Sequence, residues 1–555
     1  MAMFNIQSKL QRLKGGHQTL MDRLFVIKSA DLVEVERPRI GYRRTLTCFD
    51  LVLLGVGGII GAGIFIITGR AAHDLAGPSI VISFLISGFV CALAAICYAE
   101  LASMIPLSGS AYTYTYSTMG EIVAWIIGWD LILEYLVGAA AVASAWSNYF
   151  VSFVHDASGR SDIFDPRLVN APVQWINNPV PGFYPVVVVL PDGSQANAIV
   201  NLPAALISLL IMSVVAAGIR QSSTTLNIIV VLKFVCILIF IGTGLSYIQP
   251  ANYTPFIPPY DPTTEAYGMA GMFKASLQVF YAYLGFDVVS ATAQEARFPK
   301  RDVPIGIIGS LSICTLLYIS VSVVLTGILP YQQIPTDAPV ANAMRIVGAP
   351  ALVPVIIEFG AVVGLASVML VAMIGQPRIF QTMAQDGLLP EFLAKIHPRT
   401  RTPLPAVILS GMLCAVLGSV FPVGLLADLT SVGTLLAFIL VSLSVWILRW
   451  RQPERERRFQ IPGGFWIGGN LVPLLSATTS AALIWMGGNI AITLRVIIWL
   501  LIGLLGVYFP YGIWNSRNRY PLVPEKVNEN SQSNSNSSDS HEPLVIDEHE
   551  AEPAN

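Results

Sequence analysis

The stretch GVGGIIGAGIFII, from Gly55 to Ile67, interrupts a hydrophobic span with glycine where a membrane helix is normally uniform. A second span, FYAYLGFDVV from Phe280 to Val289, is interrupted in the same way. A broken helix leaves backbone N–H and C=O groups unpaired, which is tolerated only where they are buried in protein or line a polar cavity. Broken spans at corresponding places in two halves of a chain are typical of a transporter's substrate site.

The composition predicts an all-α polytopic membrane protein. The chain has 555 residues, of which 54% are hydrophobic and 12% are charged, whereas a soluble domain has about 25% charged residues. Runs of Leu, Ile, Val and Ala recur at close to the roughly 20 residues that span a bilayer, and they exclude the weak alternation of a membrane β-barrel. The six cysteines lie in or beside these runs, so we expect no disulfide framework.

We predict 12 transmembrane helices, with approximate limits at 46–70, 79–105, 121–153, 198–219, 225–248, 269–295, 303–329, 351–376, 404–422, 424–449, 469–488 and 493–515. The segments that this count places in the cytoplasm hold 25 Lys and Arg residues, and the outer segments hold 5. That asymmetry is a strong positive-inside signal. It predicts a multi-pass protein of the cell (inner or plasma) membrane with both termini in the cytoplasm.

The same spans divide the chain into four parts. A basic cytoplasmic tail, 1–45, precedes a ten-helix core, 46–450; two additional transmembrane helices, 469–515, are followed by an acidic cytoplasmic tail, 525–555. The acidic tail is rich in Ser and Asn, so we expect it to be disordered. The longest outer segment, 156–197, shows little periodicity and is predicted to be an irregular cap.

The first break supplies hydrogen-bond donors. Gly61, Ala62 and Gly63 permit backbone conformations that bulkier residues resist, and an outer half-helix then begins near Ile64 at mid-membrane. The free N–H groups and the positive dipole end of that half-helix face the gap. The break is therefore a predicted site for a carboxylate, built without a basic side chain.

The second break supplies acceptors. Ala282 to Gly285 separate an outer half-helix from an inner one that begins near Phe286, and the outer half ends in unpaired carbonyls. Donors and acceptors that face each other suit a zwitterion with both charges on one carbon, such as an α-amino acid. Glycine can also serve close helix packing alone, but two breaks with four intervening spans favour the site.

These stretches resemble the amino acid–polyamine–organocation (APC) superfamily and, within it, the cationic amino acid transporter family. The matching segments are GIIGAGIF (58–65), CYAELASMIPLSGSAYTYTY (97–116), LILEYLVGAA (131–140), the span around Lys233, FYAYLGFD (280–287), RFPKRDVPIGI (297–307) and QPRIFQTMAQDGLLP (376–390). They cover most of the stretch from Leu46 to Trp450, in family order, and leave out the outer loop and the acidic tail.

The resemblance implies a leucine-transporter-type fold with a 5+5 inverted repeat, 46–248 and 269–450, two extra helices and alternating access. By motif, the N–H groups of Ala62 and Gly63 would hold the substrate carboxylate, beside Gly61. The carbonyls of Ile59, Tyr281 and Leu284 would receive the substrate ammonium. The Tyr281 ring would also gate the substrate, although an aromatic ring packed in the bundle is an equal alternative.

Charge within a predicted span is costly and therefore indicates function, and two such residues are the main candidates. Lys233 lies about seven residues into span five. The resemblance places its ammonium where sodium-driven relatives hold a sodium ion, between the first break and span eight, with Ser367 as a further contact; Lys233 is thus the predicted proton-coupling residue. Glu134, in LILEYLVG, must pair or stay protonated, and the resemblance places it by the substrate cavity.

Other polar residues receive plainer interpretations. We expect Asp130, one turn from Glu134, to be solvated, and Asp287 to cap the inner half of span six. No Cys/His cluster has metal spacing, and no nucleophile and base are placed across facing spans. The sequence therefore predicts no enzyme, no metal and no cofactor.

The predicted function is import of L-amino acids by a secondary transporter, proton-coupled and sodium-independent, whose partners are its substrate, protons and the bilayer and not nucleic acid. A proton-independent exchanger and, in a different class, an amino-acid-binding membrane sensor remain alternatives. The apolar stretch GLASVMLVAM (364–373), with Met369, tilts the substrate towards neutral or broad specificity. The oligomeric state does not follow from the sequence.

Overall fold

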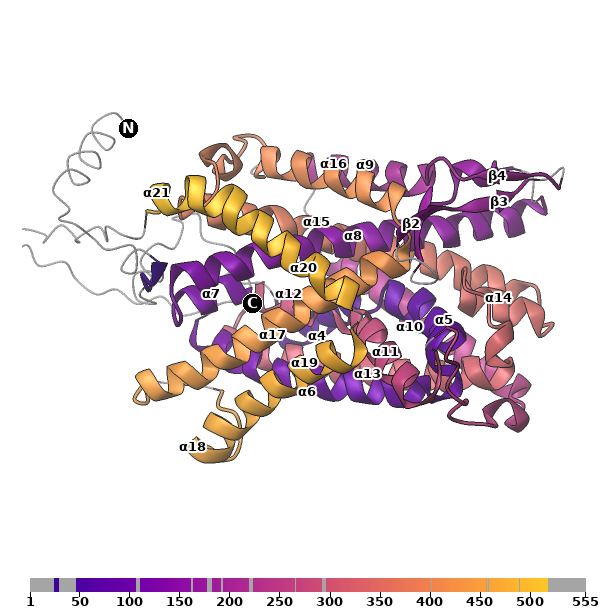
Figure 1. Cartoon of the computed structure of the whole chain (residues 1–555), viewed down its shortest axis with the longest axis horizontal. Coiled ribbons are helices and arrows are strands. Elements are labelled where there is room, and N and C mark those ends of the chain that lie inside the picture. Colours follow the sequence, from indigo (N-terminus) through magenta and orange to yellow (C-terminus); the bar gives the residue numbers. More distant parts are fainter. Residues whose placement is uncertain are drawn as a thin grey trace, which may run out of the picture. The chain divides into compact units, whose positions relative to one another are not determined.

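Helices make up most of the chain (Figure 1). The structure is a computed structural model, and it describes residues 24–28, 46–105, 110–160, 163–176, 182–190, 193–218, 223–264, 266–291, 296–400, 402–455, 457, 459–488 and 490–517. Most of the predicted basic tail and the whole predicted acidic tail lie outside the described residues.

The helices before the outer loop are α4 (Cys48–Ile59), α5 (Thr68–Ala71), α6 (Ile80–Met104), α7 (Ser110–Tyr116) and α8 (Glu121–Ser158). Those between the outer loop and the second break are α9 (Leu202–Ala216), α10 (Ser223–Gly244) and α11 (Gly268–Phe280). The later ones are α12 (Phe286–Ala291), α13 (Pro299–Ile328), α14 (Pro339–Ile346), α15 (Leu352–Gln385), α16 (Leu404–Val420), α17 (Val423–Arg451), α18 (Gly464–Trp466), α19 (Val472–Gly487), α20 (Ile490–Gly503) and α21 (Ile513–Asn515).

Eight described helical segments are long and apolar enough to cross a membrane. They are Gly63–Met104, Glu121–Ser158, Asn227–Tyr247, Pro299–Ile328, Leu352–Gln385, Val423–Arg451, Ile467–Gly487 and Ile490–Asn515. Three shorter apolar helices accompany them, at Cys48–Ile59, Leu202–Ala216 and Leu404–Val420. The structure is mostly helical with little sheet, consistent with the predicted polytopic membrane class, while the count of 12 spans and the 5+5 arrangement stay predictions.

Local sequence explains where several helices begin and end. Thr47 starts α4 with a capping box: its hydroxyl accepts from the Asp50 N–H at 3.3 Å, and the Asp50 carboxylate accepts from the Thr47 N–H at 2.9 Å. Proline occupies the first turn of α9, α13 and α16, where its missing N–H removes no helical hydrogen bond. Gly159, at φ +65°, follows the last residue of α8.

The outer segment 156–197 differs from the predicted irregular cap. Its first residues continue α8, and two antiparallel strand pairs follow: β1 (Val173–Ile176) with β2 (Gly182–Pro185), and β3 (Val187–Val189) with β4 (Gln195–Asn197). These strands are too short for their side-chain alternation to stand out in the sequence, which explains the wrong prediction.

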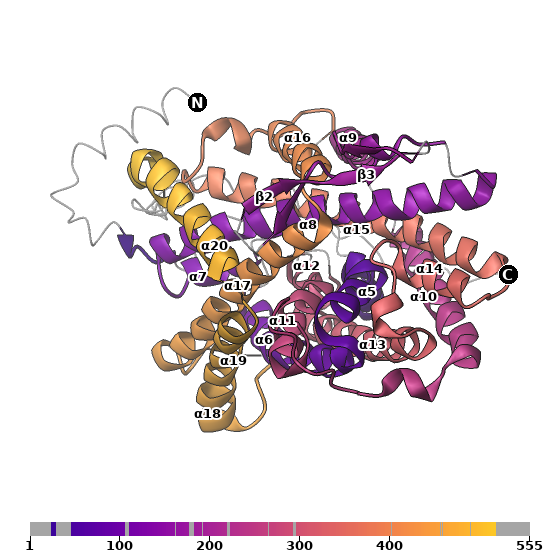
Figure 2. The ribbon, with the colours of Figure 1, turned by 45° about the vertical axis from the view of Figure 1, so that its right-hand side comes forward.

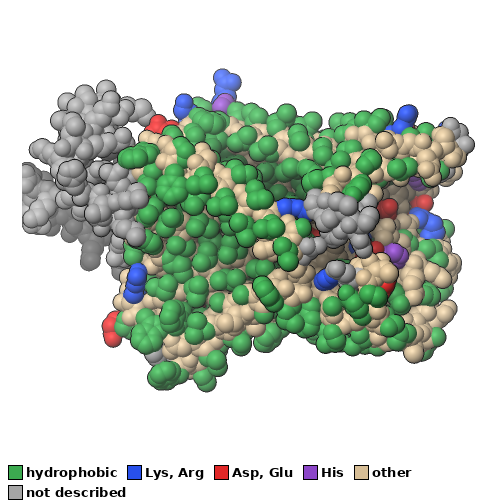
Figure 3. Space-filling view, viewed as in Figure 1, with side chains coloured by type: hydrophobic (Ala, Val, Ile, Leu, Met, Phe, Trp, Pro, Cys, Tyr) green, Lys and Arg blue, Asp and Glu red, His purple; other side chains and the backbone are tan. Residues whose placement is uncertain are grey.

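The helices form two packing groups around α8 and α6. Helix α8 packs along α15 and α17, whereas α6 packs along α13 and α11. Helices α9 and α16 lie side by side in both views (Figures 1 and 2). Hydrophobic side chains cover most of the face in Figure 3, and large apolar residues such as Leu206, Leu316 and Trp485 are exposed. An apolar exterior of this extent fits a lipid environment.

Candidate functional site

The first predicted break is present at Ile60. The Ile60 N–H still donates to the Val56 carbonyl at 2.9 Å, but the Ile60 backbone then becomes extended, with ψ at 96°. The chain resumes as a π-helical turn at Gly63–Ile67, whose first bond to the break is a long one from the Phe65 N–H to the Gly61 carbonyl, at 3.4 Å. The amides of Gly61, Ala62 and Gly63 therefore precede the first turn of the outer half-helix, where N–H groups lack helical acceptors.

The second break lies where the sequence predicts it. Helix α11 ends at Phe280, and a 3-10 turn covers Tyr281–Tyr283. Leu284 is extended, with ψ at 144°, and Gly285 has φ at +110°, a conformation that requires glycine. Helix α12 begins at Phe286. The α-helical hydrogen-bond pattern is interrupted here, and the Tyr281 carbonyl accepts from the Leu284 N–H at 3.3 Å, a 3-10-type bond.

The two breaks contact each other backbone to backbone. A Cβ atom at Gly63 would lie 2.3 Å from the Ala282 Cα, and one at Gly285 would lie 2.8 Å from the carbonyl carbon and oxygen of Gly58. Neither position can hold a side chain without moving the opposite backbone. The glycines thus allow the two backbones to approach closely and also interrupt the helices. The contact brings the start of the outer half-helix of the first break next to the end of α11.

Tyr318 of α13 joins the two breaks, and sequence reasoning missed it. Its hydroxyl lies 2.9 Å from the Ile59 carbonyl and 2.6 Å from the Ala282 carbonyl, so one proton is shared between an acceptor of each break. The side chain is fully buried. A lone tyrosine within an apolar span was the only available signal, because the sequence does not fix how α13 is rotated.

Lys233 reaches the first break from α10. Its side chain is fully buried, and its Nζ donates to the carbonyls of Gly57 at 2.9 Å and Ile60 at 3.1 Å, at the end of α4. The stem lies against α15, because a Cβ atom at Gly364 would be 3.0 Å from the Lys233 Cγ. The predicted further contact does not form in this structure, since the Ser367 hydroxyl donates to the Gly364 carbonyl at 2.8 Å.

Helix α8 contributes the remaining predicted residues. The Tyr281 hydroxyl donates to the Gly138 carbonyl of α8 at 3.1 Å, so the ring is held across the second break. Glu134, one turn earlier on α8, is buried and lies beside Thr434 of α17. Asp287 occupies the first turn of α12, as the predicted cap requires, and accepts from the Tyr135 hydroxyl at 2.5 Å.

The prediction that Asp130 is solvated is wrong. The residue has 0% of its surface exposed. Helix α17 covers it so closely that a Cβ atom at Gly433 would lie 2.8 Å from the Asp130 Oδ1. The sequence placed Asp130 near a helix end by position alone and carried no information about the helix that packs over it.

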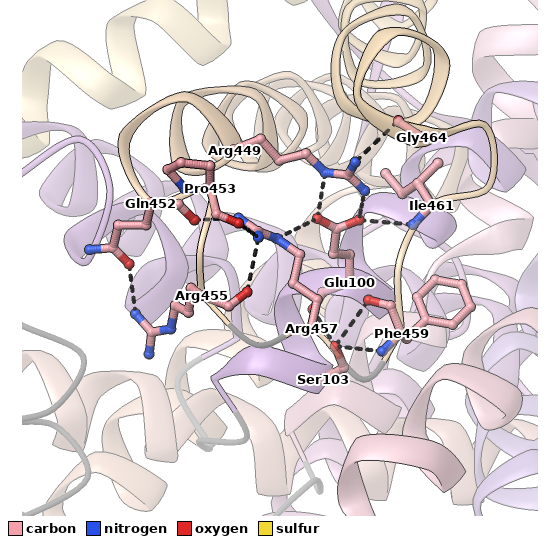
Figure 4. A network of polar contacts seen from close by, with 10 residues as sticks. All are labelled: Glu100, Ser103, Arg449, Gln452, Pro453, Arg455, Arg457, Phe459, Ile461 and Gly464. Atoms are coloured by element: carbon pink, nitrogen blue, oxygen red, sulfur yellow. Dashed lines mark hydrogen bonds and ion pairs between the residues drawn. The ribbon is translucent and has the colours of Figure 1, made fainter.

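A separate buried network surrounds Glu100, near the end of α6 (Figure 4). The Arg449 Nε donates to the Glu100 Oε1 at 2.8 Å, and the Arg449 Nη2 donates to Oε2. The Ile461 N–H donates to Oε2 at 2.9 Å, and the Arg457 Nε lies 3.4 Å from Oε1. One carboxylate thus ties α6 to the end of α17 and to the following loop. Sequence reasoning did not single out Glu100, although it lies within the matched stretch 97–116.

Within the described part of the chain, no three His, Cys, Asp or Glu side chains are grouped as metal ligands, and all six cysteines are free thiols. The breaks bring backbone N–H and C=O groups of two helices close together. A bundle of apolar helices, two of them interrupted where their backbones meet, is the structure of a polytopic membrane protein.

The comparisons identify the family. The family model described as amino acid permease matches residues 46–507, and the chain belongs to that family. The chain is 40% identical over 494 residues to the methylthioribose transporter of Bacillus subtilis, covering 89% of this chain and 98% of the relative. It is 41% identical over 488 residues to the branched-chain amino acid permease BcaP of the same organism, covering 88% and 97%.

Similarity extends to plant proteins. The chain is 38% identical over 449 residues to the vacuolar cationic amino acid transporter 2 of Arabidopsis thaliana, covering 80% of this chain and 66% of the relative. These relatives are transporters and not enzymes, which confirms both the APC resemblance and the prediction that the chain is not an enzyme.

Proposed function

We propose that the protein is a secondary transporter that imports L-amino acids by alternating access, coupled to protons and independent of sodium. The observation that supports this proposal is the close backbone contact between the two breaks. We propose that the amides of Ala62 and Gly63 bind the substrate carboxylate. The carbonyls of Ile59, Tyr281 and Leu284 would bind its ammonium. Gly61 gives the first break its freedom. Glu134 supplies a polar wall from α8.

The proposed architecture is a 5+5 inverted repeat, 46–248 and 269–450, followed by two additional helices. The breaks occupy the first helix of each proposed repeat, between α4 and α5 and between α11 and α12, which is the placement that an inverted repeat requires. We place both termini in the cytoplasm and the chain in the cell membrane, on the strength of the Lys and Arg distribution.

Lys233 is the proposed proton-coupling residue. An ammonium makes stronger, charge-assisted hydrogen bonds than a neutral amine, so loss of its proton would loosen its hold on Gly57 and Ile60 and alter the first break. The structure gives Ser367 no direct bond to Lys233, and we propose a supporting role for Ser367 only in a conformation where its hydroxyl leaves Gly364.

The proposed substrate class is neutral, with branched-chain amino acids first. Support comes from the apolar 364–373 stretch of α15, in which Met369 is fully buried, and from similarity to a branched-chain amino acid permease. The relative named for methylthioribose adds a second candidate from outside the amino acids. That molecule has neither a carboxylate nor an ammonium, so it would leave the donors and acceptors of the breaks without charged partners.

Radiolabelled uptake into proteoliposomes tests these proposals. The panel comprises leucine, isoleucine, valine, alanine, arginine, lysine and methylthioribose, with and without an imposed pH gradient and with sodium or potassium outside. We expect leucine, isoleucine and valine to accumulate when the exterior is more acidic, in either salt. Sodium-dependent uptake that ignored the pH gradient would refute the coupling, and uptake of methylthioribose alone would refute the substrate class.

A Lys233→Ala protein separates symport from exchange. If Lys233 couples the proton, this variant exchanges internal for external amino acid but no longer accumulates it against a gradient. Accumulation equal to that of the unmodified protein would show that the proton is coupled elsewhere. A protein that binds amino acid without moving it across the membrane would instead support the sensor alternative.

A further inference from the structure

Asp130 stands apart from the other buried acids because it has no partner. Its carboxyl lies in α8 with 0% of the residue exposed, and neither Oδ1 nor Oδ2 has a hydrogen-bond partner. Buried polar groups are normally hydrogen-bonded, and an exception calls for an explanation. An ionised carboxylate without a partner is far too costly in an apolar interior, so a carboxyl in this position holds a proton.

The surroundings of Asp130 offer no positive charge. The ionisable groups that interact with it are Glu134 on the same helix and Tyr98 on α6. Helices α15, α17 and α20 also pack on α8, but no Lys or Arg of the described residues forms an ion pair with Asp130. On α17, Gly433 lies against Asp130, and the adjoining Thr434 lies beside Glu134.

Three carboxyls of this region differ in how many donors they receive. Asp287 accepts from the Tyr135 hydroxyl at 2.5 Å and lies beside the amides of Gly285 and Val288. Glu134 receives the Thr434 hydroxyl as a hydrogen-bond donor, and Asp130 receives no donor. Environments that differ in this way separate the charge states of neighbouring acids. Of the three, Asp130 receives the fewest donors, so its carboxyl is the one least able to carry a negative charge.

We propose that Asp130 is a proton-carrying residue of the transport cycle, protonated while α17 covers it at Gly433 and deprotonated when α8 and α17 separate. On separation, water reaches Oδ1, the O–H bond breaks, the proton passes to water and the carboxylate that remains is solvated. Return of α17 requires a proton to be taken up again. The inference rests on the proposed proton-coupled transport. It adds Asp130 to Lys233 as a second proton-carrying residue, and Asp130 reaches water only when α8 and α17 separate.

The test compares the unmodified protein, Asp130→Asn and the control Asp165→Asn, whose carboxylate lies in the outer loop paired with Arg167. An asparagine at 130 keeps the shape of a protonated carboxyl but cannot release a proton. We expect D130N to keep substrate exchange, to lose accumulation driven by a pH gradient and to lose substrate-driven proton entry, measured with a pH-sensitive dye inside the vesicles. D165N keeps all three.

Infrared spectroscopy of the purified protein gives a readout independent of transport. We expect the carbonyl band of a protonated carboxyl to lose intensity in D130N and not in D165N. An unchanged band, or a D130N protein that accumulates substrate and moves protons like the unmodified protein, overturns the proposal. If the unmodified protein moves substrate without protons, the proposed proton coupling is wrong. The proposed transport role of Asp130 is then wrong too, even if D130N loses the infrared band of the protonated carboxyl.

Discussion

Two buried polar regions of this protein are built in opposite ways. At Glu100, one carboxylate receives Arg449 through two nitrogens, the Ile461 N–H at 2.9 Å and the charge of Arg457 at 3.4 Å. Elsewhere, the buried Lys233 ammonium donates to two carbonyls of the first break, and Asp130, on α8 against α17, has no hydrogen-bond partner. A densely bonded network fixes a geometry. A sparsely satisfied one leaves groups able to change partners, which is what binding and release require.

The largest expected effect on stability comes from breaking the ion pair between Glu100 and Arg449. Arg449→Ala leaves Glu100 buried without its main partner, and breaking one side of a buried pair costs about 3–5 kcal/mol. We expect a large fall in the thermal unfolding temperature of the detergent-purified protein. Replacing both residues by apolar ones, Glu100→Leu with Arg449→Met, recovers part of this loss, since Arg457 and the Ile461 N–H still lose the carboxylate.

The double variant also sharpens the comparison, because it removes the Glu100–Arg449 pair while Arg457 keeps its bonds to the carbonyls of Gln452, Pro453 and Arg455. If the Glu100 network only fastens α6 to the end of α17, the stable double variant transports normally. A double variant that is stable yet inactive would show that the network takes part in the cycle, and the contrast between the two regions would no longer hold.

A smaller effect on stability and a complete loss of transport are expected from Gly285→Ala. The φ of +110° costs a side chain about 1–3 kcal/mol, and the new Cβ atom would press on the Gly58 backbone at 2.8 Å. Gly242→Ala in α10 is the matched control, since a Cβ atom there has no neighbour within 4 Å. Binding of labelled leucine to the purified variants is the measurement, and unaltered binding by G285A would contradict a site at the breaks.

The sequence predicted what depends on local chemistry. The breaks were predicted from Gly61, Gly63 and Gly285, because the interruption of a helix depends on residues that are consecutive in the sequence. Tyr318 and Glu100 were missed, and Asp130 was misplaced, because their partners lie on helices distant in the chain. A helix can rotate about its axis without any change in composition, so residue spacing cannot say which neighbour a lone polar side chain will meet.

Tyr318→Phe tests the link between the breaks at a smaller scale. It removes one hydroxyl from Ile59 and Ala282, and a net hydrogen bond contributes about 0.5–1.5 kcal/mol, which corresponds to a severalfold weaker apparent affinity for the substrate. Tyr253→Phe is the control, because the Tyr253 hydroxyl donates to the Val323 carbonyl of α13, outside the breaks, at 2.8 Å. Equal KM values in uptake by the two variants would deny Tyr318 a positioning role.

The smallest effect is expected from Ser367→Ala, and it separates two accounts of Lys233. The Ser367 hydroxyl donates to the Gly364 carbonyl of its own helix at 2.8 Å, so its removal costs less than about 1 kcal/mol and leaves Lys233 on Gly57 and Ile60. We therefore expect exchange to be unchanged and accumulation driven by a pH gradient to fall slightly in proteoliposomes. Loss of accumulation as complete as in Lys233→Ala would mean that Ser367 binds the ammonium in another step of the cycle. In that step, a movement of α15 would bring Ser367 to Lys233, which has few hydrogen-bond partners and can exchange them.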